Sequence, residues 1–193
     1  MKRLIVLPAL LLLMVFTLPS CSYNAMVNKE EAVAKQWANV ESAYQRRADL
    51  IPNLVNVVRA YADFEQETLN MVIESRSKAT SIQMNANDLT PENMQQFEQA
   101  QAQLSGALSR LLVVVERYPD LKANQNFLEL QAQLEGTENR ISVERMRYNE
   151  IVGDYNSTIR RFPNFFIANM AGFQAKAYFQ ASPGTEDVPE VVF

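Results

Sequence analysis

Apolar residues alternate at spacings of three and four over much of the chain, and the most regular stretch begins at Met94. This spacing places apolar side chains on one stripe of an α-helix, where they can pack against neighbouring helices. Thr90 precedes Pro91, which is the usual order of an N-cap residue and the first helical position. We therefore predict a helix from about residue 91 to about residue 117. Its stripe comprises Phe97, Leu104, Leu108, Leu111, Val115 and Tyr118, with Gln101 as a polar exception.

A second stripe is longer and repeats every seven residues. A heptad repeat kept over this length is typical of helices that supercoil left-handedly around one another. Gly136 and Gly153 lie inside it, and each costs about 1 kcal/mol relative to alanine in a helix. We therefore expect a close helix approach or a local bend at these glycines. The stripe comprises Phe127, Leu134, Ile141, Tyr148, Tyr155 and Phe162, widened by Leu130, Ile151, Val152 and Ile159.

The amino-terminal half carries the same alternation from Met26 to Tyr61, with no change of phase at Pro52. Proline inside a helix costs about 3 kcal/mol, so proline propensity alone favours a break near Ile51. However, no glycine or polar cluster offers a reversal there. We predict a kinked helix that continues through Pro52 to about residue 83, followed by a turn at Asn85 to Asp88. The residues expected to face one core are Trp37, Val40, Tyr44, Leu54, Val58 and Tyr61, with Leu69, Val72 and Ile73 farther along.

The composition agrees with a single helical domain. Only 5 Gly and 8 Pro occur in 193 residues, and 48% of the residues are hydrophobic. This is enough for one core, and it favours long helices over turn-rich sheets. The predicted fold class is all-α, an antiparallel up-and-down bundle of long helices with coiled-coil-like heptad packing.

The chain contains no histidine and a single cysteine. Histidine is the commonest general acid–base group near neutral pH and a frequent metal ligand. The formal net charge is -4, and it becomes -6 if the first twenty residues, with Lys2 and Arg3, are removed. Because attraction to phosphate dominates nucleic-acid binding, we expect no nucleic-acid partner. We also expect no cofactor, no metal ion and no small-molecule substrate.

The amino terminus has the organisation of a lipoprotein signal peptide. A basic start precedes an uncharged apolar run from Leu4 to Phe16, which is shorter than the ~20 residues that span a bilayer. Leu18-Pro19-Ser20-Cys21 then resembles a lipobox, although Pro19 stands where a small or β-branched residue is commoner. We predict that residues 1–20 are removed and that Cys21 carries a diacylglyceryl group on its thiol and a further acyl chain, such as palmitate, on its amine. Such chains together anchor a protein firmly.

An uncleaved anchor helix around Cys21 is the competing interpretation of this segment. The cysteine is followed by Ser22 instead of Asp, which favours the outer membrane where sorting is of the Gram-negative type. The predicted localisation is therefore exported and lipid-anchored to a membrane, and in a Gram-negative cell it is the outer membrane, on the periplasmic or surface side.

Several ordered strings of residues resemble a known family. They are residues 44–55 (YQRRADLIPNLV), 118–123 (YPDLKA) and 137–141 (TENRI), together with Trp37, Tyr148-Asn149, Tyr155-Asn156 and Phe162-Pro163. They cover nearly all of residues 30 to 180, and they resemble the LemA family of bacterial membrane-associated helical proteins. The resemblance implies an antiparallel bundle of long helices tied to a membrane at its amino end. It implies no catalytic residues, because the family has no established activity. Many relatives carry an uncleaved transmembrane helix where this chain carries a lipobox.

Two groups of polar residues lie on or beside the apolar stripes. Tyr148-Asn149 and Tyr155-Asn156 repeat one heptad apart, and we expect both rings in the core with their hydroxyls on polar neighbours, in preference to a stacked cofactor. The charged residues could form a polar ligand site, but an interhelical ion-pair network that sets helix register is the interpretation we favour. They are Arg46, Arg47, Asp49, Glu138, Arg140, Glu144 and Arg145.

The stretch from Tyr155 to Thr185 contains no acidic residue and is rich in aromatic residues. Such a segment could dock on a membrane interface or on a partner. We favour a short last helix that folds back, so that its phenylalanines cover one end of the bundle. These are Phe165, Phe166, Phe173 and Phe179.

The predicted organisation is a removed signal peptide over residues 1–20, a LemA-like helical bundle over 21–181 and a disordered tail over 182–193. The predicted function is a non-enzymatic scaffold or protein-interaction module, held at the cell envelope by lipid on Cys21, with an unidentified envelope protein as its partner. A membrane-binding role through residues 163–180 is one alternative. An enzyme that uses carboxylate pairs, such as Glu30 with Glu31 or Glu65 with Glu67, is the other, although no metal-binding or phosphate-binding motif accompanies them.

Overall fold

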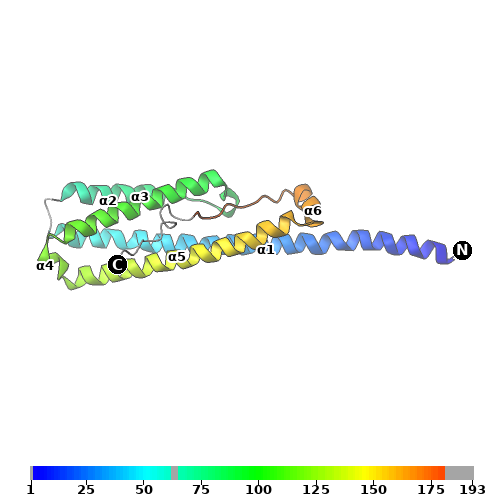
Figure 1. The fold of residues 1–193 in the computed structure, drawn as a ribbon, viewed down its shortest axis with the longest axis horizontal. Helices are drawn as coiled ribbons and strands as arrows, with labels where there is room; N and C mark the ends of the chain where they lie inside the picture. Colours follow the sequence, from blue (N-terminus) through cyan, green and yellow to red (C-terminus); the bar gives the residue numbers. More distant parts are fainter. Residues whose placement is uncertain (1, 62–64, 181–193) are drawn as a thin grey trace, which may run out of the picture.

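The computed structural model describes residues 2–61 and 65–180, with side chains described from Ser22 onward. Residues 173–180 run as an extended segment along the bundle, and we call this segment the strap (Figure 1). The described ranges contain no strand, and the predicted all-α fold class is confirmed. In chain order the elements are α1 (Lys2–Arg59), α2 (Gln66–Ser81), the 3₁₀ helix η1 (Ala86–Asp88), α3 (Pro91–Val115), α4 (Pro119–Lys122), α5 (Gln125–Arg160) and α6 (Asn164–Ala171).

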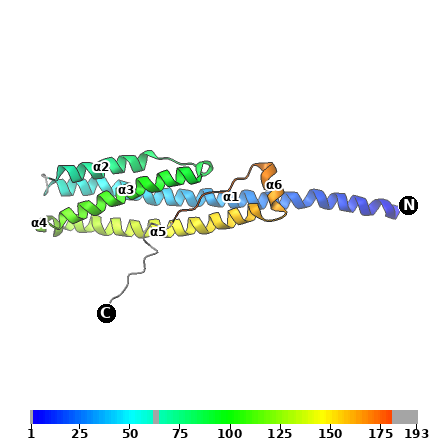
Figure 2. The same ribbon diagram turned by 45° about the horizontal axis from the view of Figure 1, so that its top comes forward.

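Four long helices lie side by side and alternate in direction, as Figures 1 and 2 show. α1 and α5 are antiparallel and form the most extensive interface between helices. α2 and α3 form a hairpin over the half of this pair that lies farther from the amino terminus, and the first part of α1 projects beyond the bundle. The predicted antiparallel up-and-down bundle is therefore confirmed.

α1 continues through Pro52 as predicted. A proline removes the N–H that would bond the carbonyl four residues earlier, which here belongs to Ala48. The structure supplies another donor, because Nε of Arg76 on α2 donates to the Ala48 carbonyl at 2.7 Å. The carbonyl left unpaired by the proline is thus satisfied from a neighbouring helix, and Pro52 itself is exposed.

α1 ends at Arg59, after which the chain reverses and α2 packs back on α1 and α3. The predicted continuation of one helix to about residue 83 is therefore wrong. The periodic pattern does not distinguish the two arrangements, since Leu69 and Val72 are apolar at helical spacing in both. After the reversal they are buried with Leu54 and Val58, which gives the bundle its fourth long helix.

Polar contacts between the neighbouring loops brace this reversal. Nη2 of Arg117 donates to Oε1 of Glu65 at 3.0 Å, and the hydroxyl of Tyr118 lies 3.3 Å from the same oxygen. The Tyr61 hydroxyl accepts a bond from Nδ2 of Asn124 at 3.0 Å. Tyr61 was predicted to face the core, but its side chain is 44% exposed because α1 ends before it.

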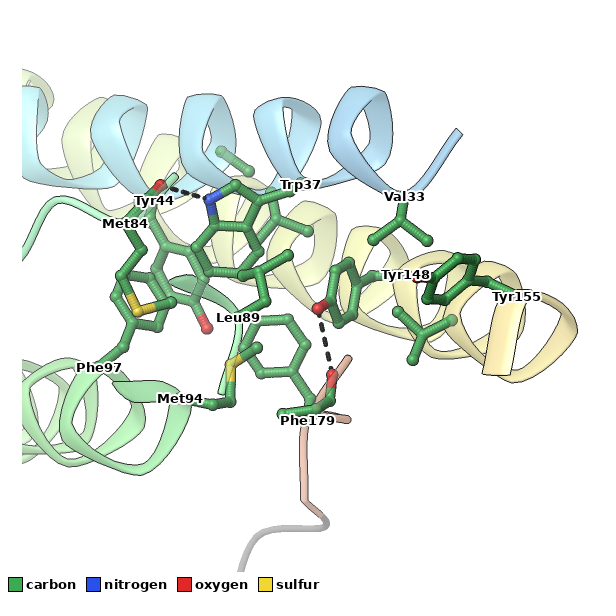
Figure 3. Packing of buried hydrophobic residues seen from close by; sticks show 14 of the residues in the cluster. Val33, Trp37, Tyr44, Met84, Leu89, Met94, Phe97, Tyr148, Tyr155 and Phe179 are labelled. Atoms are coloured by element: carbon green, nitrogen blue, oxygen red, sulfur yellow. Dashed lines mark hydrogen bonds between the residues drawn. The ribbon is translucent and has the colours of Figure 1, made fainter. Parts of the chain in front are cut away.

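Buried residues form two clusters along the bundle. In the first, which we call the aromatic core, η1, the first turns of α3 and the strap pack on α1 and α5 (Figure 3). The main side chains of the aromatic core are Val33, Trp37, Val40, Tyr44, Leu89, Phe97, Tyr148, Tyr155 and Phe179. The second, which we call the aliphatic core, lies between α1, α2, α3 and α5, and includes Ile51, Leu54, Val58, Leu69, Leu104, Leu111 and Phe127. The buried positions of α1 were thus predicted correctly, but they serve two cores instead of one.

α3 begins as the sequence predicts. Pro91 is its first residue, and the Thr90 hydroxyl accepts a hydrogen bond from the backbone N–H of Asn93 at 3.3 Å. The predicted turn before it is also present, because η1 spans Ala86–Asp88 and the side chains of Asn85 and Asp88 cap its first turn.

Most apolar positions of the predicted α5 stripe are buried or partly buried, but the last one is not, and the glycines do not mark a close helix approach. A Cβ atom at Gly136 would meet nothing within 4 Å, and one at Gly153 would meet the Tyr178 ring only at van der Waals distance, so neither glycine marks a close helix approach. Phe162 was predicted to continue the stripe but is 84% exposed. The reason is that α5 ends at Arg160 and the next residue is extended.

Candidate interaction site

The two Tyr-Asn pairs of α5 bind the strap through its backbone. Asn156 donates from Nδ2 to the Lys176 carbonyl at 2.8 Å, and its Oδ1 accepts from the Lys176 N–H at 2.9 Å. Asn149 makes the same two bonds with Phe179, at 3.0 and 2.9 Å. Each asparagine therefore pairs with one strap residue through both donor and acceptor, as a neighbouring β-strand would.

The two tyrosines add a bond each. The Tyr148 hydroxyl donates to the Ala177 carbonyl at 3.1 Å (Figure 3), and the Tyr155 hydroxyl donates to the Gln174 carbonyl at 2.9 Å. Burial raises the pKa of the Tyr148 hydroxyl. Burial also raises the pKa of Tyr155, and the nearby Glu30 carboxylate raises it further. Both hydroxyls thus stay protonated and able to donate.

The repeat on α5 matches the repeat of the strap. Seven residues of helix span about 10.5 Å at 1.5 Å per residue, and three residues of extended chain span about 10 Å. The strap residues bound by successive asparagines are Lys176 and Phe179, and those bound by successive tyrosines are Gln174 and Ala177. A heptad repeat of Tyr-Asn can therefore hold an extended peptide at every third residue.

Side chains of the strap fill the space between α1, α3 and α5. The Phe179 ring is 4% exposed and lies 5.2 Å from the Tyr148 ring and 6.0 Å from the Trp37 ring, measured between centroids (Figure 3). Lys176 is also buried, and its Nζ lies 3.1 Å from the Ala86 carbonyl and 3.3 Å from the Glu30 carboxylate. The strap is therefore part of the core and not a loose covering.

A polar groove of about 530 Å³ is lined in part by Gln180, the last described residue of the strap. Arg47, whose side chain is 3% exposed, forms its floor. The guanidinium donates to Ser105 Oγ at 3.0 Å, to Glu138 Oε2 at 2.8 Å and to Gln101 Oε1 at 2.5 Å. Its Nε is buried and has no hydrogen-bond partner. Further residues that line the groove are Tyr44, Gln95, Glu98, Gln99, Arg145 and Gln180.

Arg145 and Glu98 also line this groove. The two side chains pair at 2.9 Å, and Glu98 also accepts from the Gln180 N–H at 3.2 Å. Burial raises the pKa of Glu98, while Arg145 and the Gln180 N–H act in the opposite direction. The Arg145 guanidinium lies 4.7 Å from the centre of the Phe179 ring and donates to the Gln180 carbonyl at 2.9 Å. Arg145 and Glu98 therefore bind the carbonyl and the N–H of Gln180, the last described residue of the strap.

The predicted ion-pair network is present in part. Arg47–Glu138 and Arg145–Glu98 cross between helices. Arg140 and Glu144, by contrast, pair at 2.9 Å within α5. The buried Glu144 carboxylate also accepts from Gln36 of α1 at 2.8 Å, which the charge pattern did not indicate.

The two remaining charged residues of the predicted network lie on the surface of α1. Asp49 accepts from Gln45 one turn earlier, at 2.7 Å. Arg46 lines a second groove of about 440 Å³ together with Asn39 and Thr137. Neither side chain joins the interhelical pairs described above.

α6 does not cover the bundle end in the predicted way. Its Ala168 is buried in the aromatic core, and Phe173 packs against that core. Phe165 and Phe166, however, are 48% and 59% exposed. Of the four phenylalanines predicted to form a cap, the two on the strap pack inward and the two on α6 are exposed, because α6 turns a different side, with Ala168 as its buried residue, toward the core.

The carboxylate pairs do not converge on a common centre. Glu30 lies against Lys176 and Tyr155, whereas Glu65 lies at the other end of the bundle against Arg117 and Tyr118. Among the described residues, no group of three or more His, Cys, Asp and Glu side chains is placed to hold a metal ion. None of the described helices combines the length and hydropathy needed to cross a membrane.

Three predictions fall on residues without described side chains or outside the described residues. The Cys21 backbone lies within α1, but its side chain is not among those described, so its lipidation stays a prediction. The same holds for removal of residues 1–20. The predicted disordered tail over 182–193 lies outside the described residues.

The strap and its binding by α5 were not predicted. The sequence placed Tyr148 and Tyr155 in the core with polar neighbours, and this is confirmed. It did not identify those neighbours as the backbone of residues 173–180. The available signal was the asparagine after each tyrosine, because an amide group carries the donor and acceptor that pair with one peptide unit.

Fold and site together define an elongated helical-bundle protein whose core is completed by a bound extended segment. The LemA family model matches residues 36–193, and the chain belongs to this family. It is similar to Protein LemA of Metamycoplasma hominis, with 24% identity over 159 residues, which are 82% of this chain and 69% of that protein.

The chain is also similar to Magnetosome protein MamQ 2 of Paramagnetospirillum magneticum, with 24% identity over 180 residues, 83% of this chain and 65% of that protein. Magnetosome protein MamQ of Magnetospirillum gryphiswaldense matches to the same extent. The chain thus spans about two thirds of the length of these relatives. Family membership and these relatives fit an envelope-associated protein of a family without known enzymatic activity.

Proposed function

We propose that this chain is a non-enzymatic scaffold, anchored to a membrane of the cell envelope by lipid on Cys21, that presents the side of its bundle to a protein partner. The observation that carries the proposal is the continuity of α1, which runs without a break from the lipobox region to Arg59. A lipid on Cys21 would be joined to the bundle with no flexible linker between them.

Continuity of α1 also sets the reach of such a scaffold. The segment from Ser22 to Arg59 is helical throughout, and at 1.5 Å per residue it extends about 57 Å. The aliphatic core and the α1–α2 reversal would thus stand at a fixed distance from the membrane. The polar groove, which is lined by Arg47, Glu98 and Arg145, would lie part of the way along this rod.

The groove is the surface we assign to the partner. It is open, it carries charges of both signs, and Gln180 of the strap contributes to its lining. Gln95 and Gln99 are exposed on α3, and they could form hydrogen bonds with the backbone or with polar side chains of a partner. Polar surfaces of this type are typical of non-obligate protein interfaces.

The anchor is tested by labelling with a radioactive fatty acid in cells. The wild-type chain should incorporate label and stay with membranes through a high-salt wash, whereas Cys21→Ser should incorporate no label and should be released by that wash. Ser22→Ala is the matched control and should behave as wild type, since only the thiol accepts the lipid. Label that persists in Cys21→Ser, or an intact Met1 on the mature wild-type chain, would overturn the lipid anchor.

The partner surface is tested by site-specific photocrosslinking in intact cells. A photoreactive residue at Gln99 lies in the groove, and one at Glu74 lies on the exposed face of α2, away from the groove. We expect a discrete adduct with an envelope protein from Gln99 that is absent from Glu74 and weakened by Arg145→Glu. Equal adducts from both positions would argue against the groove as the binding surface.

A further inference from the structure

We propose that the exposed aromatic residues in and just before α6 insert into the headgroup region of an anionic bilayer, so that the membrane holds this protein at two places. The inference rests on the proposed anchoring at Cys21, because the same membrane supplies both contacts. We call the contact surface the aromatic end, and it consists of Phe162, Phe165, Phe166 and Met170.

The aromatic end is unusually exposed for residues of this kind. Phe162 and Met170 are 84% and 90% exposed, and Phe165 and Phe166 are about half exposed. The rings pack on each other instead of on the core, with centroids 6.1 Å apart for Phe162 and Phe166 and 5.7 Å apart for Phe165 and Phe166. Contiguous apolar surface of this kind on a folded protein indicates an interaction site, whereas single exposed residues do not.

α6 holds this surface in a fixed place. Ala168 is buried between α1 and α5, and Nδ2 of Asn164 donates to the Thr158 carbonyl at 3.1 Å. Gly172 ends the helix in the left-handed conformation, with φ of 80°. The aromatic end is therefore presented by an anchored helix, and its exposure is a feature of the fold.

Its position points to the lipid surface. α6 lies at the end of the bundle from which the first part of α1 projects (Figure 1). The Phe173 ring, which follows α6, meets the Tyr23 ring at 5.7 Å in an edge-to-face contact. Tyr23 lies two positions after Cys21, which is about 3 Å along a helix. A bilayer that receives lipid from Cys21 would thus lie directly beside α6.

The charges around the aromatic end favour anionic lipid over other occupants. Arg160 and Arg161 are exposed at the start of the segment, and no acidic residue occurs between Tyr155 and Thr185. The nearest acid on α5, Asp154, is paired with Lys29. Aromatic side chains concentrate at membrane–water interfaces, and basic residues beside them are attracted to anionic headgroups.

The test uses the lipidated full chain reconstituted into vesicles of phosphatidylethanolamine and phosphatidylglycerol that contain brominated lipid. Phe166→Trp places a reporter in the aromatic end. Leu128→Trp is the matched control, because Leu128 is 43% exposed on α5 at the opposite end of the bundle. Both variants also contain Trp37, so its fluorescence contributes equally to the two measurements. We expect several-fold stronger quenching of the added tryptophan in Phe166→Trp, and weaker quenching when phosphatidylglycerol is omitted.

Equal, weak quenching at both positions in a chain that carries lipid would overturn the docking while leaving the anchor intact. If the added tryptophan of Phe166→Trp is not quenched but becomes more shielded as the protein concentration rises, the aromatic end binds a second copy of the chain. This result would overturn the membrane docking. Failure of the anchor is recognised separately, by absence of label on Cys21. The Cys21→Ser chain then decides the docking by itself, since it should still sediment with anionic vesicles, and Phe162→Ser/Phe166→Ser should reduce that binding several-fold.

Discussion

Replacement of Phe179 by alanine tests whether the strap is part of the core. The ring is 4% exposed and contacts Trp37, Tyr148 and Phe97. Removing a fully buried phenylalanine loses about 1.5–3 kcal/mol of transfer free energy, and the cavity and lost ring contacts bring the usual cost to about 3–5 kcal/mol. We expect a loss of this size in the free energy of unfolding, because the surrounding helices cannot collapse into the space.

The assay is urea unfolding of the purified chain followed by the fluorescence of Trp37, which stacks on Phe179. Phe166→Ala is the control, since it removes the same side chain from an exposed position and should cost less than about 1 kcal/mol. The m-value should stay unchanged if the native state remains compact. A Phe179→Ala cost below about 1 kcal/mol, equal to that of the control, would show that the strap is not needed for the core.

Three further results are expected from the same measurement. Asn156→Ala should cost about 2–4 kcal/mol because it leaves two buried backbone groups of the strap unpaired, whereas the exposed Asn126→Ala should be nearly neutral; equal effects would contradict the pairing. Arg47→Ala should cost about 2–4 kcal/mol by unpairing the buried Gln101, and a neutral result would mean that water replaces the guanidinium. Burial raises the pKa of Glu98, so its folded form holds the proton to higher pH than its unfolded form. The free energy of unfolding of the wild type should therefore fall relative to that of Glu98→Gln as pH rises from about 4.5 through the raised pKa. If the free energies of the two chains change in parallel with pH, this reasoning is refuted.

The main helices could be predicted because their apolar spacing is regular and their caps are local. Thr90 and Pro91 mark the start of α3 through bonds to the next few residues, which a sequence displays directly. Continuity through Pro52 was also predictable from the unbroken phase. Its physical basis, the donation from Arg76 to the Ala48 carbonyl, joins two helices and could not be seen in the sequence.

The errors share a cause, which is that periodicity reports a helix face and not the partner of that face. Leu69 and Val72 keep helical spacing whether the chain continues or reverses, so the end of α1 at Arg59 was missed. Phe165 and Phe179 are the same residue type in one short segment, yet one is exposed and the other is buried. What separates them is that the Asn149 side chain of α5 binds the backbone of Phe179, and this pairing depends on tertiary contacts.

The place of the strap in the chain has a consequence for the order of folding. Residues 173–180 are translated after all the long helices, yet Phe179 occupies the centre of the aromatic core. Until they emerge, a nascent chain that has formed α1 to α5 keeps Trp37 and Tyr148 beside an unfilled slot. The short path from α5 through α6 makes the final closure a local event, which is fast once the segment is available. Completion of this half of the bundle therefore waits until residues 173–180 have emerged, and a late change in the emission of Trp37 should mark it.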